Sequence, residues 1–297
     1  MSTCAILYHA LSPLHPGVGQ AADLVDLPIA RTKVGIPLLP GSSIKGVIRE
    51  ERRPNMTADE WAAVFGPDHK NASEHAGAIG FADARLLALP VRSFRGTFAF
   101  VTSPLLLRLA ARDLALCGIA PPALPALSGS ARACVSTRKS ALVLEGTLYL
   151  ESLDLTSQPS SELDDWSDLL GPLAWPDPPD FFARHIAMVD DDVMGFLWST
   201  ATQLDTRIRI DRDTGTVADG ALWIEESLPP ETLMLGLADA WPSRRAGVAM
   251  TSQQVLDVVL PRSTEHLQFG GKGTVGRGRC AVTVVPAEGG ADHADDA

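Results

Sequence analysis

Short apolar and alternating runs divide this chain into many small elements. Runs typical of strands occupy residues 5–10, 78–91, 96–101, 141–151 and 280–285. Helical spacing occurs between these runs, and one helix is also expected near the end of the chain, over 252–260. Because strands and helices are mixed and few helices can serve as crossovers between parallel strands, the order favours an α+β fold over a doubly wound sheet.

Local capping signals mark the starts of three further helices. Ser, Thr and Asp side chains accept hydrogen bonds from the first helical turn, and proline is tolerated there because its missing N–H would have no partner. The three are a helix over 44–53 capped by Ser42 and Ser43, a short helix after the T-x-x-E capping box at 57–60, and a helix over 104–117 with Ser103 as its N-cap.

Proline, glycine and acidic residues mark the segments expected to be irregular. Residues 12–40 have no clear period, and a loop of that length inside a compact protein is usually functional or disordered. Residues 157–180 are also expected to be loop, and the acidic tail 286–297 to be disordered. By contrast, residues 206–210 and 217–224 flank the turn sequence D-R-D-T-G, which predicts a β-hairpin.

Charge is unevenly distributed along the chain, whose 297 residues carry a net charge of −11 at pH 7. Residues 1–150 hold 15 basic and 11 acidic residues, whereas residues 151–192 hold one basic and 11 acidic residues. Affinity for a polyanion depends on local fields, so the negative total does not exclude nucleic-acid binding. The acidic segment is expected to be a solvated face or a surface that docks a basic partner.

The cysteines and the N-terminus argue against other protein classes. No two of the four cysteines have C-x-x-C spacing, so neither a disulfide framework nor a metal-binding motif can be inferred from them. The first residues lack the basic and apolar regions of a signal peptide. The most apolar stretch, residues 104–116, is interrupted by three charged residues and is shorter than the ~20 residues that a membrane helix needs. We therefore expect a cytoplasmic protein without membrane contact.

A basic helix is the first candidate site. Lys45, Arg49 and Arg52 fall at positions i, i+4 and i+7 and so share one face of the expected helix. The start of a helix also presents unpaired N–H groups and a partial positive charge, which suit a phosphate. The pattern fits either a phosphate-binding edge or an ordinary solvated face.

A glycine-rich loop, residues 270–278, is the second candidate. It contains the G-x-G-x-x-G pattern of dinucleotide-binding proteins, with Gly271 and Gly273 as the first two glycines. That pattern requires a following helix and an acid about 20 residues later, whereas a strand is expected here, so a nucleotide-dependent oxidoreductase is rejected. What remains is a bare backbone that phosphates can approach, with Lys272 and Arg277 beside it, or a plain tight turn.

His15, Asp23 and Asp26 lie in the long N-terminal loop. Histidine and carboxylate side chains can perform general acid–base catalysis or hold a metal ion. On their own these three residues are weak evidence, because such residues also occur in loops by chance or as caps.

Four segments of the chain resemble the RAMP superfamily of CRISPR proteins, and within it the backbone subunits of type III-B (Cmr) effector complexes. They are HPGVGQAADLVDLPIARTKVGIPLLPGSSIKGVIRE at 15–50, GAIGFADARLLALPVRSFRGTFAFVTSPLLL at 77–107, RIRIDRDTGTVADGALWIEESLPPETL at 207–233 and LQFGGKGTVGRGR at 267–279. A single glycine-rich loop would be weak evidence, whereas four segments in the expected order are specific.

This resemblance implies a single RAMP domain over 1–285 with a ferredoxin-like, RRM-related palm. A β-hairpin thumb at about 203–223 would be inserted in the palm, together with helical and loop insertions that include the acidic insertion at 151–192. Members of the family stack as copies of themselves along a CRISPR RNA in a helical filament with other Cmr subunits. Each thumb displaces one base of the pairing between guide and target, and the complex serves antiviral defence.

The resemblance also implies roles for individual residues. The target-cleaving acid of the family corresponds to Asp26 in V-D-L-P, and His15 and Glu225 match positions linked to the same site. The position after Glu225-Glu226 is often aromatic in the family and is Ser227 here, so stacking at that position is not expected. Residues implied to hold the guide RNA are Ser42, Ser43, Lys45, Arg49, Gly271, Lys272, Gly273 and Arg277.

The expected activity is a metal-dependent endoribonuclease that cuts single-stranded target RNA paired to the guide. Asp26 would bind a divalent ion, Mg²⁺ or Mn²⁺, or accept the proton of a ribose 2′-OH, while His15 would position or protonate the RNA. One acid is too few for a two-metal site held by protein alone, so RNA oxygens must supply ligands or cleavage depends chiefly on geometry. The alternative is a guide-binding scaffold of the same complex that does not cut.

Overall fold

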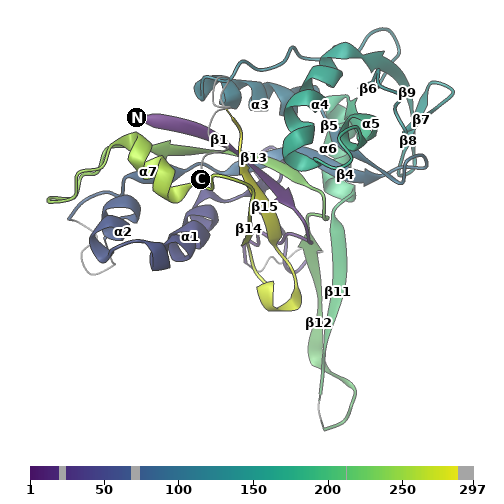
Figure 1. Ribbon diagram of the computed structural model, residues 1–297. Helices are drawn as coiled ribbons and strands as arrows, with labels where there is room; N and C mark the ends of the chain where they lie inside the picture. The colour runs from purple at the N-terminus through teal and green to yellow at the C-terminus, as the bar shows by residue number, and fades with distance from the viewer. Residues whose placement is uncertain (20–24, 68–73, 212, 287–297) are drawn as a thin grey trace.

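The structure, a computed structural model, describes residues 1–19, 25–67, 74–211 and 213–286. One large mixed sheet runs through these residues (Figure 1). In chain order its strands are β1 (Ser2–Ala10), β2 (Leu38–Leu39), β3 (Ile79–Phe81), β4 (Ala84–Arg92), β5 (Phe98–Thr102), β6 (Ala133–Ser136), β7 (Val143–Leu144), β8 (Thr147–Leu150), β9 (Leu153–Ser160), β10 (Ile186–Val189), β13 (Leu233–Ala240), β14 (Glu265–Gln268) and β15 (Arg279–Val284).

The strand order places three distant segments at one end of the sheet. Neighbouring strands follow the order β14-β15-β1-β13-β4-β5-β10-β6-β9-β8-β7, with β2 beside β4 and β3 beside β13. β1 lies between β13 and β15 and is antiparallel to both, with His9 opposite Leu233 and Ala10 opposite Cys280. The loop after β1, the chain entering β13 and the glycine-rich loop entering β15 therefore meet at the same end.

Alternation along β1 shows how the core is divided. Ile6 and Tyr8 belong to one cluster of buried apolar residues, and Ala5 and Leu7 belong to the other. Because successive side chains of a strand point to opposite faces, the central sheet is covered on both faces. In Figure 1, α1, α2 and α7 lie on one side of the molecule and α3 to α6 on the other. Their bounds are α1 (Gly41–Arg52), α2 (Ala58–Phe65), α3 (Pro104–Leu116), α4 (Ser161–Ala174), α5 (Phe181–His185), α6 (Asp191–Thr200) and α7 (Ser252–Val259).

The expected hairpin is present and forms the feature that projects farthest in Figure 1. β11 (Gln203–Ile210) and β12 (Val217–Ser227) pair antiparallel in a sheet of their own. The α+β class is confirmed, α2 and α3 begin at the capping residues expected from the sequence, and the helix expected over 252–260 is present as α7. In this article the projecting β11–β12 hairpin is called the thumb. The tail from residue 287 lies outside the described residues.

The expectation of a loop over 157–180 is wrong for residues 157–174 and holds only for residues 175–180. β9 continues to residue 160, and α4 follows at once, with the Ser160 hydroxyl accepting a hydrogen bond from Leu163 N at 3.3 Å. Leu163, Trp166 and Leu170 are buried and have helical spacing. The prolines and acids dominated the composition, but Glu162, Asp165 and Asp168 lie on the outer part of a helix whose apolar face is buried, and Asp164 is itself buried and accepts hydrogen bonds from Ser136 and Thr137.

Three other expectations need correction. The run 141–151 is not one strand, because Glu145 and Gly146 both have positive φ (51° and 78°) and form a tight turn between β7 and β8. Ser42 and Ser43 are not caps: α1 begins at Gly41 after Pro40, without a side-chain cap, and both serines lie in the first turn. Similarly, the run 78–91 is divided between β3 and β4, and Asp83 in the break accepts a hydrogen bond from Gly41 N at 2.8 Å.

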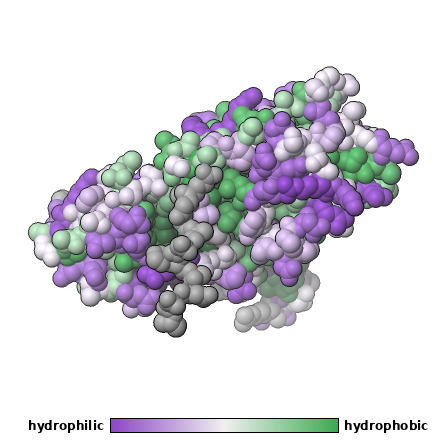
Figure 2. Space-filling view, turned by 45° about the horizontal axis from the view of Figure 1, so that its top comes forward, coloured by the Kyte–Doolittle hydropathy of each residue, from purple (hydrophilic) through white to green (hydrophobic). Residues whose placement is uncertain are grey.

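Among the described residues, no helix is long and apolar enough to cross a membrane. On the face shown in the space-filling view, hydrophilic and hydrophobic residues are interspersed (Figure 2).

Candidate functional site

The outer edge of β12 binds the long N-terminal loop at the base of the thumb. One edge of β12 pairs with β11, and the other forms a short parallel bridge to the loop, with Leu27 N donating to Ile224 O at 3.1 Å and Glu226 N donating to Leu27 O at 3.0 Å. Farther along, Leu14 and Leu228 exchange two backbone hydrogen bonds. The loop is irregular, as expected, yet it is fixed by the strand on which the thumb is built.

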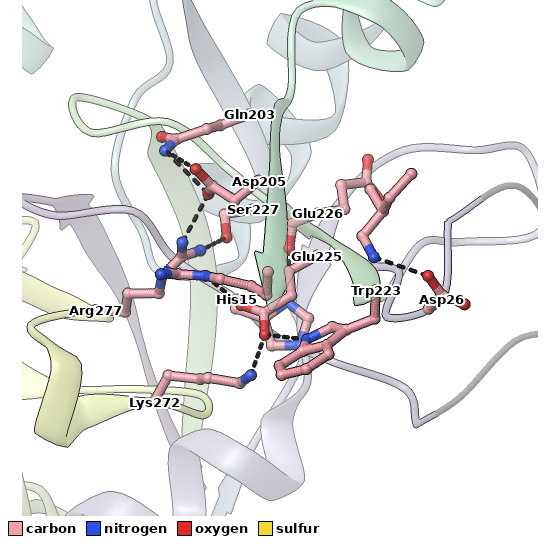
Figure 3. Close-up of polar contacts among 12 residues, drawn as sticks. His15, Asp26, Gln203, Asp205, Trp223, Glu225, Glu226, Ser227, Lys272 and Arg277 are labelled. Atoms are coloured by element: carbon pink, nitrogen blue, oxygen red, sulfur yellow. Dashed lines mark hydrogen bonds and ion pairs between the residues drawn. The ribbon is translucent and has the colours of Figure 1, made fainter. Parts of the chain in front are cut away.

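Asp26 is held by the same strand edge. Its Oδ2 accepts a hydrogen bond from Ile224 N at 2.7 Å, and its side chain is half-buried (Figure 3). Within the described residues no donor reaches its second oxygen, Oδ1, which is thus available to accept a proton or a hydrogen bond. Asp23, the other acid of the loop, lies outside the described residues.

His15 is anchored two positions farther along β12. Its Nδ1 lies 2.6 Å from Glu226 O, and because a carbonyl oxygen can only accept, Nδ1 carries the hydrogen. The anchors of His15 and Asp26 are therefore about 7 Å apart by the rise of a strand. A Cβ at Gly17 would lie 2.5 Å from His15 Nε2, which explains the glycine in H-P-G.

Glu225 is buried, with 1% of its surface exposed, and its carboxylate is fully engaged. Lys272 donates to Oε1, Trp223 Nε1 donates to the same oxygen at 2.6 Å, and Arg207 Nε lies 3.5 Å from Oε2. Burial alone would raise the pKa of Glu225, but the hydrogen bonds from Lys272 and Trp223 and the charges of Lys272 and Arg207 outweigh it and hold the pKa below its usual range. These partners therefore favour the carboxylate form of Glu225 in this conformation.

Asp205 lies directly opposite Glu225 on β11. Two like charges facing each other across strands repel, and each is neutralised by a different cation of the glycine-rich loop. Arg277 Nη2 donates to Asp205 Oδ2 at 2.6 Å, and its Nη1 donates to Ser227 Oγ at 2.5 Å (Figure 3). Lys272 and Arg277 thus join the glycine-rich loop to the thumb base by two ion pairs.

The glycine-rich loop is shaped by close backbone approaches. Gly270 (φ +73°) would place a Cβ 2.4 Å from His15 O, and Gly278 (φ +78°) would place one 1.9 Å from Phe269 O. Gly271 N donates to His15 O at 3.3 Å, and a 3-10 turn follows at Gly273–Val275. β15 then begins at residue 279, so the rejection of a dinucleotide site is confirmed.

The basic face of α1 forms a separate candidate site. Lys45 Nζ donates to Ile79 O at 3.1 Å, and burial, with a smaller effect of the Arg49 charge, lowers the pKa of Lys45. The Arg49 guanidinium lies 4.0 Å from the centre of the Trp61 ring. Arg52 donates to Glu265 and to Val259 O, the latter at 2.8 Å. Figure 1 shows α1 to the left of β15 and the thumb to its right.

The expected metal ligands do not form a metal site by themselves. Within the described residues no group of three or more His, Cys, Asp or Glu side chains could hold a metal ion. Asp26 gives one oxygen to a backbone N–H, His15 Nδ1 donates to a carbonyl, and Glu225 is neutralised by Lys272. A divalent ion requires several oxygen ligands, so the metal remains a prediction that depends on oxygens from elsewhere.

Sequence reasoning missed the partners that hold these residues. Ion pairs at the thumb base involve Arg31, Asp205 and Arg207. Glu226 contacts the N-terminal loop both before and after Asp26. The alternation of Asp205 and Arg207 on one face of a strand was visible, but their partners lie far away in the chain.

Comparison with known proteins gives consistent matches over almost the whole chain. The family model described as RAMP superfamily matches residues 8–281. A protein of Pyrococcus furiosus named "CRISPR system Cmr endoribonuclease Cmr4" is 33% identical over 283 residues, which cover 93% of this chain and 93% of that protein. A crystal structure of oligomeric Cmr4 from Pyrococcus furiosus matches with a TM-score of 0.73 at 25% identity and covers 96% of this chain and 98% of the other.

A cryo-EM structure of the type III-B Cmr-beta complex bound to cognate target RNA also contains a similar chain. The TM-score is 0.70 at 20% identity, and the match covers 96% of this chain and 98% of the other. At that identity the likeness shows the fold alone.

Proposed function

Because this chain belongs to the RAMP superfamily, we propose that it is a backbone subunit of a type III-B CRISPR effector complex, binds the guide RNA and cleaves target RNA paired to the guide. The relative named as a Cmr endoribonuclease and the likeness to oligomeric Cmr4 support this proposal. Its partners would be CRISPR RNA, target RNA, further copies of itself and other Cmr subunits. The activity would take place in the cytoplasm, in antiviral defence.

One observation carries the catalytic part of the proposal: Asp26 is fixed against the thumb strand by the hydrogen bond from Ile224 N. The thumb is the part of the molecule that would distort the paired RNA. Because Asp26 is hydrogen-bonded to the base of the thumb, it would keep a constant position relative to the RNA that the thumb distorts. Geometric control of this kind can contribute ~7–11 kcal/mol in favourable systems.

The proposed reaction is an internal displacement in the target strand. Asp26 Oδ1 accepts the proton of a ribose 2′-OH, and the 2′ oxygen forms a bond to the adjacent phosphorus. The bond from phosphorus to the 5′ oxygen breaks, that oxygen takes a proton from solvent water, and Asp26 returns to solvent the proton that it accepted. The products are a 2′,3′-cyclic phosphate and a 5′-hydroxyl. His15 positions the loop through the hydrogen bond that its Nδ1–H donates to Glu226 O, and this bond does not involve the other ring nitrogen, Nε2.

Guide binding is proposed for the first turn and basic face of α1 and for the glycine-rich loop. Ser42 and Ser43 lie in that first turn, and Lys45 and Arg49 lie on the following turns. Lys272 and Arg277 are engaged with Glu225 and Asp205, so they would hold RNA through their remaining donors or by exchanging partners. Gly271 and Gly273 would let the backbone approach a phosphate.

The test compares wild type with Asp26→Ala and Asp26→Asn in the reconstituted complex, with guide RNA and an end-labelled complementary target. Asp154→Ala serves as the matched control, because Asp154 is exposed on β9. We expect evenly spaced cuts from wild type and the control, a cleavage rate at least ~100-fold lower for both Asp26 variants, and unchanged target binding.

Each other outcome contradicts a different part of the proposal. Equal cleavage by wild type and the Asp26 variants would show that another residue performs the reaction. Binding without cleavage by wild type would favour a guide-binding scaffold. Products with 3′-hydroxyl ends would exclude the internal displacement, and the same reactions with Mg²⁺, Mn²⁺ or a chelator test the predicted metal requirement.

A further inference from the structure

Glu226 continues the contact between the N-terminal loop and β12 at the point where backbone pairing ends. Backbone bonds join Leu27 to Ile224 and to Glu226. The carbonyl of Glu226 accepts from His15 Nδ1, and the next loop donor, Ile29 N, donates to the Glu226 side chain, to Oε2, at 3.1 Å. The Glu226 side chain therefore takes the place of a backbone acceptor and extends the loop attachment beyond Asp26.

Arg31 completes this attachment from the other side. Its Nη2 donates to Glu226 Oε1 at 2.5 Å, and its Nη1 donates to Gly35 O at 3.1 Å and to Trp198 O at 3.0 Å. One guanidinium thus connects the thumb strand, the N-terminal loop and the end of α6. Only 6% of the Glu226 surface is exposed, and removing one partner of a buried ion pair leaves the charge of the other uncompensated.

The backbone of Glu226 also contacts the loop, both before and after Asp26. Its carbonyl accepts the hydrogen bond from His15 Nδ1, and its N–H donates to Leu27 O. Asp26 lies between these two contacts in the chain. A shift of Glu226 would therefore move His15 and the Asp26 segment together.

We propose that Glu226 and Arg31 are positioning residues for target-RNA cleavage: their buried ion pair fixes the loop segment that carries Asp26 against the base of the thumb. This inference rests on the proposed nuclease function and deepens it. Neither side chain needs to touch the RNA. Their effect is transmitted through the Ile29 N–H contact and the resulting position of Asp26.

The first experiment measures single-turnover cleavage and target affinity of the complex with Glu226→Gln and Arg31→Lys. Glutamine keeps the size but loses the charge, and lysine cannot reproduce the planar fork that reaches three acceptors. We expect cleavage to slow by ~10- to 100-fold, because a misplacement of about 1 Å can have an effect of that size. Target affinity should stay within about 2-fold, and Glu145→Gln, an exposed acid of the β7–β8 turn, should behave as wild type.

A combination of variants separates positioning from general destabilisation. In the Asp26→Ala background, Glu226→Gln should cause no further loss of residual cleavage, because the residue that it positions is absent. The double variant Glu226→Gln with Arg31→Lys should be no slower than the slower single variant, as expected for residues that act as a unit. Additive losses in either combination would overturn the proposal.

Hydrogen exchange of the chain supplies a measurement that does not depend on cleavage. The amide of Ile29 should exchange faster in Glu226→Gln, while amides of α7 should be unaffected. Unchanged exchange at Ile29, or wild-type cleavage by Glu226→Gln, would overturn the positioning role while leaving the nuclease proposal intact. If wild type itself failed to cleave, both proposals would fall, and the exchange data would show whether the ion pair still orders the loop.

Discussion

The two halves of the thumb use the same pair of strands in opposite ways. At the base, the face carrying Asp205, Arg207 and Glu225 is crowded with charge, and each of these side chains has a partner of opposite sign. Toward the tip, several large apolar side chains are exposed among polar ones: Leu222 is 62% exposed and Ile208 is 49% exposed. Both halves are held by the same β11–β12 pairing, so the difference lies in what the rest of the chain contributes.

That difference shows how an inserted hairpin is given a fixed position. A hairpin on its own is only marginally stable, and the base is stabilised by segments far away in sequence. Glu225 and Lys272 are 47 residues apart, and Asp205 and Arg277 are 72 residues apart. Among the described residues, no ion pair joins the tip to a distant segment of the chain in the way that these two pairs join the base. The base is therefore fixed to the glycine-rich loop and the N-terminal loop, while the tip is an exposed surface.

Replacing Arg277 with methionine should have the largest effect on stability. It would leave Asp205 opposite Glu225 with no cation of its own from the glycine-rich loop. Because Asp205 is partly exposed, we expect a loss of about 1–3 kcal/mol in the free energy of unfolding, less than for a fully buried pair. Urea denaturation of the isolated chain measures this loss.

Arg209→Met is the matched control, because Arg209 lies exposed on the same hairpin as Asp205. It should change stability by less than about 0.5 kcal/mol. Adding Asp205→Asn to Arg277→Met should recover part of the loss, since it removes the unpaired charge. Equal losses for Arg277→Met and Arg209→Met would show that the base is not held by this pair.

Lowering the pH should weaken the base by a smaller amount. Burial would raise the pKa of Asp205, but hydrogen bonds from Arg277 and Gln203 and the charges of Arg277 and Arg207 outweigh it, so the pKa of Asp205, like that of Glu225, lies below its usual value. Both groups release their protons more readily in the folded chain. Their contribution is therefore complete above their ordinary pKa values of 3.8 and 4.5 and is lost as the pH falls through the folded values.

The measurement is the free energy of unfolding at several values from about pH 6 to pH 3. Stability should decline toward acid in wild type and decline less steeply in Glu225→Gln, which has already lost one of the two groups. The loss should be smaller than that of Arg277→Met, because a protonated acid can still accept hydrogen bonds from its partners. Parallel curves for the two proteins would contradict a role for Glu225 ionisation.

Elements with strong local signals could be predicted from the sequence. The T-x-x-E box, the Ser103-Pro104 start and the turn sequence of the thumb all act over a few residues, and all are present in the structure. The helix α4 was missed because the prolines and acids of its composition were weighted above the helical spacing of Leu163 and Trp166. The Glu145-Gly146 turn was missed because only Gly signals positive φ, and here a glutamate shares it.

In the candidate site, too, some residues could be predicted from the sequence and others could not. His15, Asp26 and Glu225 were expected from a family resemblance, and the structure brings all three to β12. Their roles remain predictions. The residues that hold them could not be inferred locally, because Arg31 and Glu226 are 195 residues apart and meet only after the sheet has brought the loop and the thumb to one end. Sequence patterns report neighbours in the chain, whereas this site is made of neighbours in space.

Substitutions at the tip should have the smallest effect and provide the contrast to the base. Leu222→Thr and Ile208→Thr each replace an exposed apolar side chain with one that suits a strand, so each should change the free energy of unfolding by less than about 0.5 kcal/mol. Urea denaturation should be performed at one protein concentration, because self-association adds to apparent stability. Losses at the tip as large as that of Arg277→Met would mean that the tip packs against another copy in solution, and the division between a fixed base and a free tip would fail.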